Sequence, residues 1–246
     1  LSLSLSFSLF LFLTHTRAHA RTHTIAYGRR IYIAGGHTPP DDIPQTGVLV
    51  FDTATCSWLD GACPPLPQSR MECNAAASDG RVYVICGSTG GSAGGGSVPL
   101  ASTISWAPGE TSWRAEPDAP AELRQFGSAV VDGVIYCCGG MPGEFAAFDT
   151  SARRWLTELE PHPMAPQAPL VGAHNGDVWV CGGSRQRAVH RYEISSNRWH
   201  REPDLPTDQS WGAAHSWKGR LLVMGGAHFD DRVGQCRLRN TCNTCR

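Results

Sequence analysis

The sequence lacks an excess of charge of either sign. Its 246 residues include 21 lysines and arginines against 22 aspartates and glutamates, which gives a formal net charge of -1. Proteins whose main partner is a nucleic acid or a membrane surface carry a basic patch or stripe. We therefore predict neither a nucleic-acid partner nor a membrane partner.

The sequence also lacks any N-x-S/T glycosylation acceptor. Its ten cysteines lie mostly within apolar runs, and the adjacent Cys137 and Cys138 would point to opposite faces of a strand. These features predict buried free thiols rather than a disulfide framework. They favour a reducing setting, so we expect the cytoplasm or the nucleus and no secretion.

The first apolar run, within Leu1–Thr24, has neither an initiating methionine nor a basic residue before it. A secretory signal peptide needs a basic region ahead of its apolar core. The Leu-Ser and His-Thr rhythm corresponds to translated CT and CA dinucleotide repeats. We interpret residues 1–24 as a low-complexity tract, disordered or artefactual, with a genuine leader as the alternative.

Glycine and proline are abundant, with 27 and 17 residues, and the glycines mark a repeat. An apolar run that ends in glycine recurs every 43 to 53 residues. The five copies are IYIAGG (31–36), VYVICG (82–87), IYCCGG (135–140), VWVCGG (178–183) and LLVMGG (221–226). A fixed period in this range predicts a repeat architecture.

Two further signals recur with these runs, the first with all five and the second with four. A turn dipeptide precedes each of the five runs. In chain order the dipeptides are Tyr27-Gly28, Asp79-Gly80, Asp132-Gly133, Asn175-Gly176 and Lys218-Gly219. Asn-Gly and Asp-Gly are typical of two-residue hairpin turns. An aromatic residue, six others and a tryptophan then follow at 51–58, 106–113, 148–155 and 192–199. Turn-forming residues fill the middle of that phrase, so two hairpins, or four antiparallel strands, are predicted per unit.

A four-stranded unit of this size cannot bury both faces alone, and stacked blades of a propeller solve the problem. The combined motifs resemble the kelch repeat from about Thr24 to Gly226. The resemblance implies an all-β, kelch-type β-propeller of four-stranded antiparallel blades. We expect it to be incomplete, with about four blades and part of a fifth. The expected domain is 25–228, followed by an irregular tail at 229–246, and the expected blades are 25–64, 67–117, 120–160, 163–205 and 206–228.

The repeat itself predicts which residues have structural roles. These are the repeat glycines and the tryptophans of the second hairpin, namely Gly35, Gly36, Gly87, Gly139, Gly140, Gly182, Gly183, Gly225, Gly226, Trp58, Trp113, Trp155 and Trp199.

Four residues at the start of the innermost strands are candidates for partner binding. Arg70 and Arg124 precede Tyr83 and Tyr136 by similar distances, and Gln167 and Gln209 take the equivalent places in the next two units. In the kelch propellers that this chain resembles, such residues stand near the channel mouth and some bind acidic segments. A guanidinium's forked donors suit that role. The alternative is that the arginines hold neighbouring loops through backbone carbonyls.

Other candidate chemistry is weak. The G-x-S-x-G at 90–94 lacks the following helix that a nucleophile elbow needs, so a flexible loop is predicted at 87–97. Cys236, Cys242 and Cys245 lack the fourth ligand of a structural zinc site. His15, His19 and His23 share a helical spacing in a tract that does not favour a helix. We predict no metal and no cofactor.

Two functional hypotheses follow from the resemblance. The first is a non-catalytic kelch module that binds a partner protein or peptide through inter-strand loops at one face, as in substrate-recognition subunits of ubiquitin ligases. The second is a fragment of an enzymatic kelch protein of the galactose oxidase type or the metal-dependent specifier type. An enzyme should show converging metal ligands, and the histidines and carboxylates here are scattered. We therefore predict a binding module rather than an enzyme.

Overall fold

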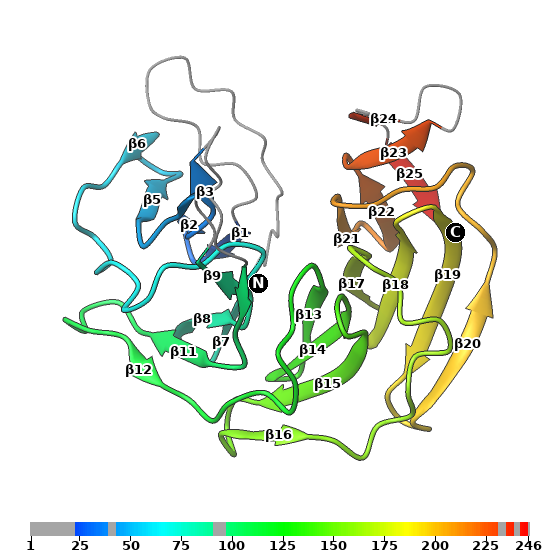
Figure 1. Ribbon diagram of the computed structural model, residues 1–246, viewed down its shortest axis with the longest axis horizontal. Coiled ribbons are helices and arrows are strands. Elements are labelled where there is room, and N and C mark those ends of the chain that lie inside the picture. The colour runs from blue at the N-terminus through cyan, green and yellow to red at the C-terminus, as the bar shows by residue number, and fades with distance from the viewer. Residues whose placement is uncertain (1–22, 39–42, 91–96, 231–234, 239–241, 246) are drawn as a thin grey trace. The chain divides into compact units, whose positions relative to one another are not determined.

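The computed structural model describes residues 23–38, 43–90, 97–230, 235–238 and 242–245 (Figure 1). Over these residues the protein consists of strands, turns and loops, with no helix. No described segment is therefore a helix that is long and apolar enough to cross a membrane. The chain divides into two compact units, residues 1–124 and 125–246, which we describe one at a time.

Unit 1 contains two four-stranded antiparallel sheets, which we call blades one and two. In each blade the strands lie side by side in chain order. Blade one consists of β1 (His23–Tyr27), β2 (Arg30–Ala34), β5 (Val48–Asp52) and β6 (Ser57–Trp58). Blade two consists of β7 (Asn74–Ser78), β8 (Arg81–Ile85), β11 (Thr103–Trp106) and β12 (Arg114–Ala115). The first strands of the two blades, β1 and β7, lie in contact.

Unit 2 contains blades three, four and five, and its first strands β13, β17 and β21 also contact one another in order. Blade three consists of β13 (Gly127–Val131), β14 (Val134–Gly139), β15 (Glu144–Asp149) and β16 (Arg154–Leu156). Blade four consists of β17 (Leu170–His174), β18 (Asp177–Gly183), β19 (Gln186–Glu193) and β20 (Arg198–Glu202). Blade five consists of β21 (Ala213–Trp217), β22 (Arg220–Met224) and β25 (Cys242–Cys245). The predicted all-β fold of four-stranded antiparallel blades is confirmed for blades one to four, and the described part of blade five has three strands.

The first hairpin of each blade turns where the sequence predicts in four of five copies. Both residues of each dipeptide have positive φ in Asp79-Gly80, Asp132-Gly133, Asn175-Gly176 and Lys218-Gly219. This is the backbone of a type I′ turn, which matches the twist of the two strands. In blade one the prediction is wrong by one residue. Tyr27 pairs with Arg30, so the turn residues are Gly28 and Arg29.

The spacing of the aromatic residue and the tryptophan is explained by the second hairpin. Phe51 pairs across the strands with Trp58, Phe148 with Trp155 and Tyr192 with Trp199. The ring centroids are 5.1, 5.3 and 5.0 Å apart in these three pairs. In blade two the ladder ends one pair earlier, at Ser105 and Arg114, and the rings of Trp106 and Trp113 are 6.3 Å apart. Six intervening residues thus place the two rings opposite each other.

The hydrophobic cores lie between successive blades within each unit. In unit 1, Tyr32 and Val50 of blade one pack in one cluster with Val82 and Trp106 of blade two. In unit 2, clusters of the same kind join blade three to blade four and blade four to blade five. Within each unit, every sheet therefore buries at least one face against a neighbouring blade, as repeat architectures require.

The inner strand of blade one, β1, has five residues that all pair with β2, and it equals β7 in length. Two expectations, about the tail and the cysteines, can be compared with the structure. Where we expected an irregular tail from residue 229, β23 (Ala227–Asp230) pairs with β24 (Gln235–Leu238), and β25 joins blade five. The expected buried free thiols are present at Cys63, Cys73, Cys86, Cys137, Cys138 and Cys181, whereas Cys56 is exposed.

Candidate interaction face

The four residues that lead into the first strand of a blade form a recurring structure, which we call the entry segment. The entry segments are residues 70–73, 123–126, 166–169 and 209–212. In each case the last glycine of the preceding blade's apolar run donates its N–H to the carbonyl of the first residue of the segment. The four bonds are Gly36 to Arg70 at 2.7 Å, Gly87 to Leu123 at 2.8 Å, Gly140 to Pro166 at 2.9 Å and Gly183 to Gln209 at 2.7 Å. The repeated glycine therefore bonds its blade to the segment of chain that follows that blade or leads into the next one within the same unit.

In three of the four pairs the first glycine is needed for close approach. A Cβ on Gly35, Gly139 or Gly182 would lie 2.4, 2.2 or 2.5 Å from the carbonyl oxygen of Arg70, Pro166 or Gln209. All three glycines also have positive φ, which strains any residue with a side chain. Cys86 is the one exception to glycine at this place, and it adopts φ +51°.

The third residue of every entry segment has a left-handed backbone. Glu72, Gln125, Ala168 and Trp211 have φ of 55°, 57°, 51° and 61°. None is glycine, asparagine or aspartate, the residues that tolerate this conformation best. The sequence gives no sign of this feature, because the surrounding contacts impose it.

The four predicted partner-binding residues do not share one position, which corrects the expected equivalence. Arg70 and Gln209 are the first residues of their entry segments, whereas Arg124 and Gln167 are the second. Successive side chains of an extended chain point in opposite directions. Accordingly Arg70 and Gln209 are only 1% and 2% exposed, while Arg124 and Gln167 are partly exposed.

Arg70 holds backbone carbonyls in the interior of unit 1. Its Nη1 donates to the carbonyls of Cys86 and Ser102 at 3.0 and 2.7 Å, and its Nη2 donates to the Ser102 hydroxyl at 2.7 Å. Burial lowers the pKa of Arg70, but a guanidinium keeps its charge under ordinary conditions. Bonds of this kind are expected if Arg70 holds a neighbouring loop through backbone carbonyls, which was the alternative to partner binding.

The two glutamines also make contacts within unit 2. Gln167 donates from Nε2 to Oε1 of Gln125 at 2.8 Å and lies 3.1 Å from the Met141 sulfur. Gln209 donates from Nε2 to the carbonyl of Gly225 at 2.6 Å. Gln209 thus stabilises the entry to blade five, and Gln167 is the more accessible of the two.

Loops between second and third strands flank the entry segment of blade two in unit 1. Two short hairpins, β3 (His37–Thr38) with β4 (Ile43–Pro44) and β9 (Ser88–Thr89) with β10 (Val98–Pro99), lie on either side of the Arg70 segment. Gln45 forms a bridge to Arg70, and Met71 forms a bridge to Ser88. We call this continuous strip of backbone the cap ribbon.

The cap ribbon presents two exposed aliphatic side chains. Ile43 is 43% exposed and Val98 is 55% exposed, each directly before a proline on the second strand of its hairpin. Between the two hairpins the hydroxyls of Ser69 and Thr89 bond at 2.9 Å. Single exposed aliphatic residues are common. Two at matched places of neighbouring loops form a candidate contact surface.

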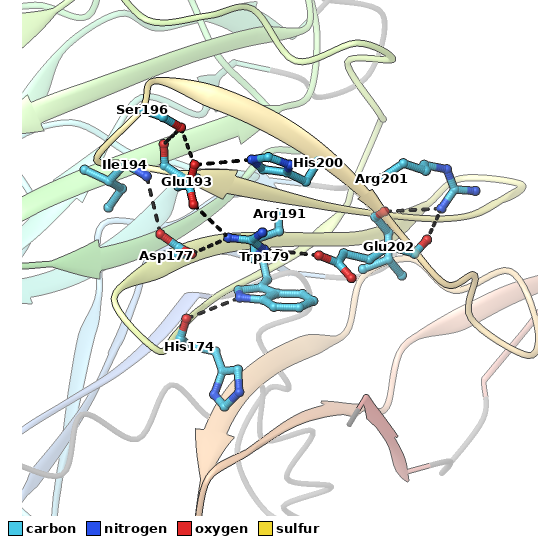
Figure 2. Close-up of polar contacts among 11 residues, drawn as sticks. His174, Asp177, Trp179, Arg191, Glu193, Ile194, Ser196, His200, Arg201 and Glu202 are labelled. Carbon is cyan, nitrogen blue, oxygen red and sulfur yellow. Dashed lines mark hydrogen bonds and ion pairs between the residues drawn. The ribbon is translucent and has the colours of Figure 1, made fainter.

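Charged residues on blade four form a network of their own (Figure 2). Arg191 on β19 donates from Nη1 to Asp177 at 2.7 Å and from Nε to Glu202 at 3.1 Å. The bonds to Asp177 and Glu202 raise the pKa of Arg191. Beside it, Glu193 bonds Ser196 and lies 3.4 Å from His200. Because the acids here face basic or hydroxyl partners across three strands, the network stabilises the sheet.

The described residues contain no group of three or more histidine, cysteine or acidic side chains able to hold a metal ion. Burial raises the pKa of the Cys73 thiol to about 11 and those of Cys63 and Cys86 to about 12, so these sulfurs are not nucleophiles near neutral pH. Several candidate residues from the sequence lie outside the described part of the structure. These are His15, His19 and most of the 90–94 motif, together with the side chains of four residues whose backbone is described, His23, Cys236, Cys242 and Cys245.

The repeated blades, fastened through glycine pairs, define a repeat protein of the β-propeller class. Comparison with curated proteins finds kelch-repeat relatives. Human kelch repeat and BTB domain-containing protein 8 is 26% identical over 191 residues, which cover 73% of this chain and 31% of the relative. Kelch repeat and BTB domain-containing protein 1 of camelpox virus is 27% identical over 81% of this chain and 36% of its own length. Kelch-like protein 40 of Xenopus tropicalis is 23% identical over 80% and 33%.

These relatives support the kelch-repeat family, as the motifs predicted. No family model matches the chain. The chain spans about a third of the length of the curated relatives that it matches.

Proposed function

We propose that this chain is a protein-interaction module that binds a partner protein through the loops at the entry ends of its blades. The observation that carries the proposal is the cap ribbon of unit 1, where Ile43 and Val98 are exposed on two connected loops. Loops on a rigid β scaffold are common sites of binding because the scaffold fixes their ends. The kelch-repeat relatives are consistent with such a role.

The predicted partner-binding residues enter this proposal in two ways. Arg124 and Gln167 are partly exposed and are proposed to contact the partner. Arg70 and Gln209 are buried and are proposed to act indirectly, by holding the loop backbone in place. A substitution of Arg70 would therefore weaken binding only by disturbing the fold.

The experiment is affinity capture from cell lysate with quantitative mass spectrometry. The test variant carries Ile43→Asp and Val98→Asp. The control carries Leu49→Asp, because Leu49 is in the same unit and is similarly exposed at 42%. Proteins captured by the wild type and the control, but lost with the double variant, would support the proposal, provided that the thermal midpoints agree. Identical capture by all three proteins would contradict it.

A finer part of the proposal is that the bound partner is a ubiquitin-ligase substrate, in the cytoplasm or the nucleus. Kelch-repeat relatives that carry BTB domains support it. The captured partner should then accumulate ubiquitin chains when the proteasome is inhibited in cells that express the chain. Unchanged ubiquitylation would remove the ligase role while leaving the interaction module intact.

The enzymatic alternative has a direct test of its own. Elemental analysis of the purified protein should find no copper or iron in stoichiometric amount if the chain acts only by binding. A stoichiometric metal would contradict the binding-only proposal and would direct attention to the histidines and cysteines outside the described residues.

A further inference from the structure

One buried histidine stands where the other repeats have an apolar residue. Eight residues before the first strand, the connection between blades carries Leu66, Ala119, His162 and Leu205 in successive copies, and all four are buried. The three apolar residues make the same backbone bond. Leu66 donates to Thr46, Ala119 to Ala101 and Leu205 to Arg187, each at 2.8 Å. His162 therefore introduces a titratable ring at a core position of the repeat.

The ring of His162 holds a tight turn closed. Its Nδ1 accepts the backbone N–H groups of Met164 and Ala165 at 3.1 and 3.0 Å. An imidazole nitrogen can accept only when it carries no proton, so the turn requires neutral His162. The ring packs edge-to-face against His190 and Trp199, with centroids 4.8 and 4.5 Å away.

Few charged groups face this ring pair. His190 on β19 is the titratable group against His162, while Arg201 on β20 and Asp204 act on His190. Burial, with a smaller effect of His190, lowers the pKa of His162 to about 3. Burial also lowers the pKa of His190; Arg201 adds to this effect and Asp204 opposes it. Charging either ring therefore disfavours charging the other.

The turn leads directly to the contact between blades three and four. Ala165 has φ +42° and immediately precedes Pro166, whose carbonyl accepts the N–H of Gly140 at 2.9 Å. A Cβ on Gly143 would lie 2.9 Å from the Cβ of Ala165, so the segment fits closely against blade three. The turn and the glycine bond thus lie on one short piece of chain.

We propose that residues 162–166 form a pH-sensitive latch, in which protonation of His162 opens the turn and releases the bond between Gly140 and Pro166. This inference stands on unit 2 alone and does not depend on the proposed function. It would give the entry to blade four an acid response that the entry to blade five lacks, because Leu205 replaces the histidine there.

The direction of the pH dependence follows from the pKa of His162. The value is about 3 with the latch closed and the ordinary 6.5 with it open, so the closed form is fully stable above pH 6.5 and weakens as the pH falls toward 3. At pH 5 the opening equilibrium should be raised about 30-fold relative to neutral pH.

Amide hydrogen exchange by NMR tests the latch. We expect the protection factor of the Gly140 N–H, corrected for intrinsic exchange, to fall about 30-fold between pH 7.5 and pH 5. The Gly183 N–H, which makes the equivalent bond to Gln209 at 2.7 Å, is the internal control. His174 and His215, whose pKa values burial also lowers, would act on global stability and so on both amides. Equal falls at Gly140 and Gly183 would overturn the proposal.

Two variants exchange the residues of the repeat. His162→Leu should abolish the pH dependence at Gly140, and Leu205→His should create one at Gly183. If His162→Leu does not fold, His162→Asn keeps an acceptor at the turn without a titrating ring. Persistence of the pH dependence at Gly140 in either folded His162 variant would overturn the latch.

Discussion

The glycine pairs predict a stability difference between two substitutions that look alike in sequence. Gly182 and Gly225 are both the first glycine of a pair, with φ of 62° and 64°. A Cβ on Gly182 would lie 2.5 Å from the Gln209 carbonyl oxygen, whereas a Cβ on Gly225 would meet no atom of the described residues within 4 Å. Each Gly→Ala change costs about 1–2 kcal/mol for the left-handed backbone. Gly182→Ala should lose a further ~2–3 kcal/mol from overpacking and from the strained Gly183 to Gln209 bond.

Urea unfolding followed by circular dichroism measures the difference. We expect free energies of unfolding lowered by roughly 3–5 kcal/mol in Gly182→Ala and by about 1–2 kcal/mol in Gly225→Ala. The comparison isolates the contact between blades four and five, because the backbone angles are nearly equal. Equal losses for the two variants would refute the reasoning that close approach of the next blade selects glycine.

Three further outcomes are expected. Arg70→Met removes the guanidinium donor from the carbonyls of Cys86 and Ser102, of which the Ser102 carbonyl also accepts the Cys86 N–H at 3.1 Å. It should lower the free energy of urea unfolding by about 3 kcal/mol, and a loss under about 1 kcal/mol would contradict the structural role of Arg70. The Arg81 guanidinium lowers the pKa of Glu110 to about 2. The ion pair therefore stabilises the fold at pH values above the ordinary pKa of 4.5, and this stabilisation is lost as the pH falls toward 2. Arg81→Met should raise the pKa of Glu110 toward 4.5 in a carboxyl NMR titration, and an unchanged pKa would refute the pairing. Asn197 has φ +55°, and its Oδ1 accepts the Tyr192 hydroxyl at 2.5 Å. Both Asn197→Ala and Asn197→Gly remove that bond, but alanine should have the lower thermal unfolding midpoint, because the left-handed backbone costs it about 1 kcal/mol of stability. A midpoint that is equal or higher for alanine would argue against backbone strain at this residue.

The hairpins could be predicted from the sequence because each depends on neighbours in the chain. The dipeptides Asp79-Gly80, Asp132-Gly133 and Asn175-Gly176 favour positive φ by their own chemistry, and they turn where expected. The aromatic residue and the tryptophan are cross-strand partners because six residues between them close a hairpin. The one local error, at Gly28 and Arg29, arose because glycine can occupy either turn position.

The candidate interaction face depended on contacts between distant segments. The register of the entry segments separates Arg70 from Arg124, and a shift of one residue reverses the direction of a side chain. The left-handed Glu72, Gln125, Ala168 and Trp211 carry no local signal, because packing imposes their backbone angles. The sequence by itself therefore determined the repeat, its hairpins and the kelch resemblance. Only the tertiary structure decided which polar side chains are buried, because burial depends on the neighbouring blade, which the local chain does not specify.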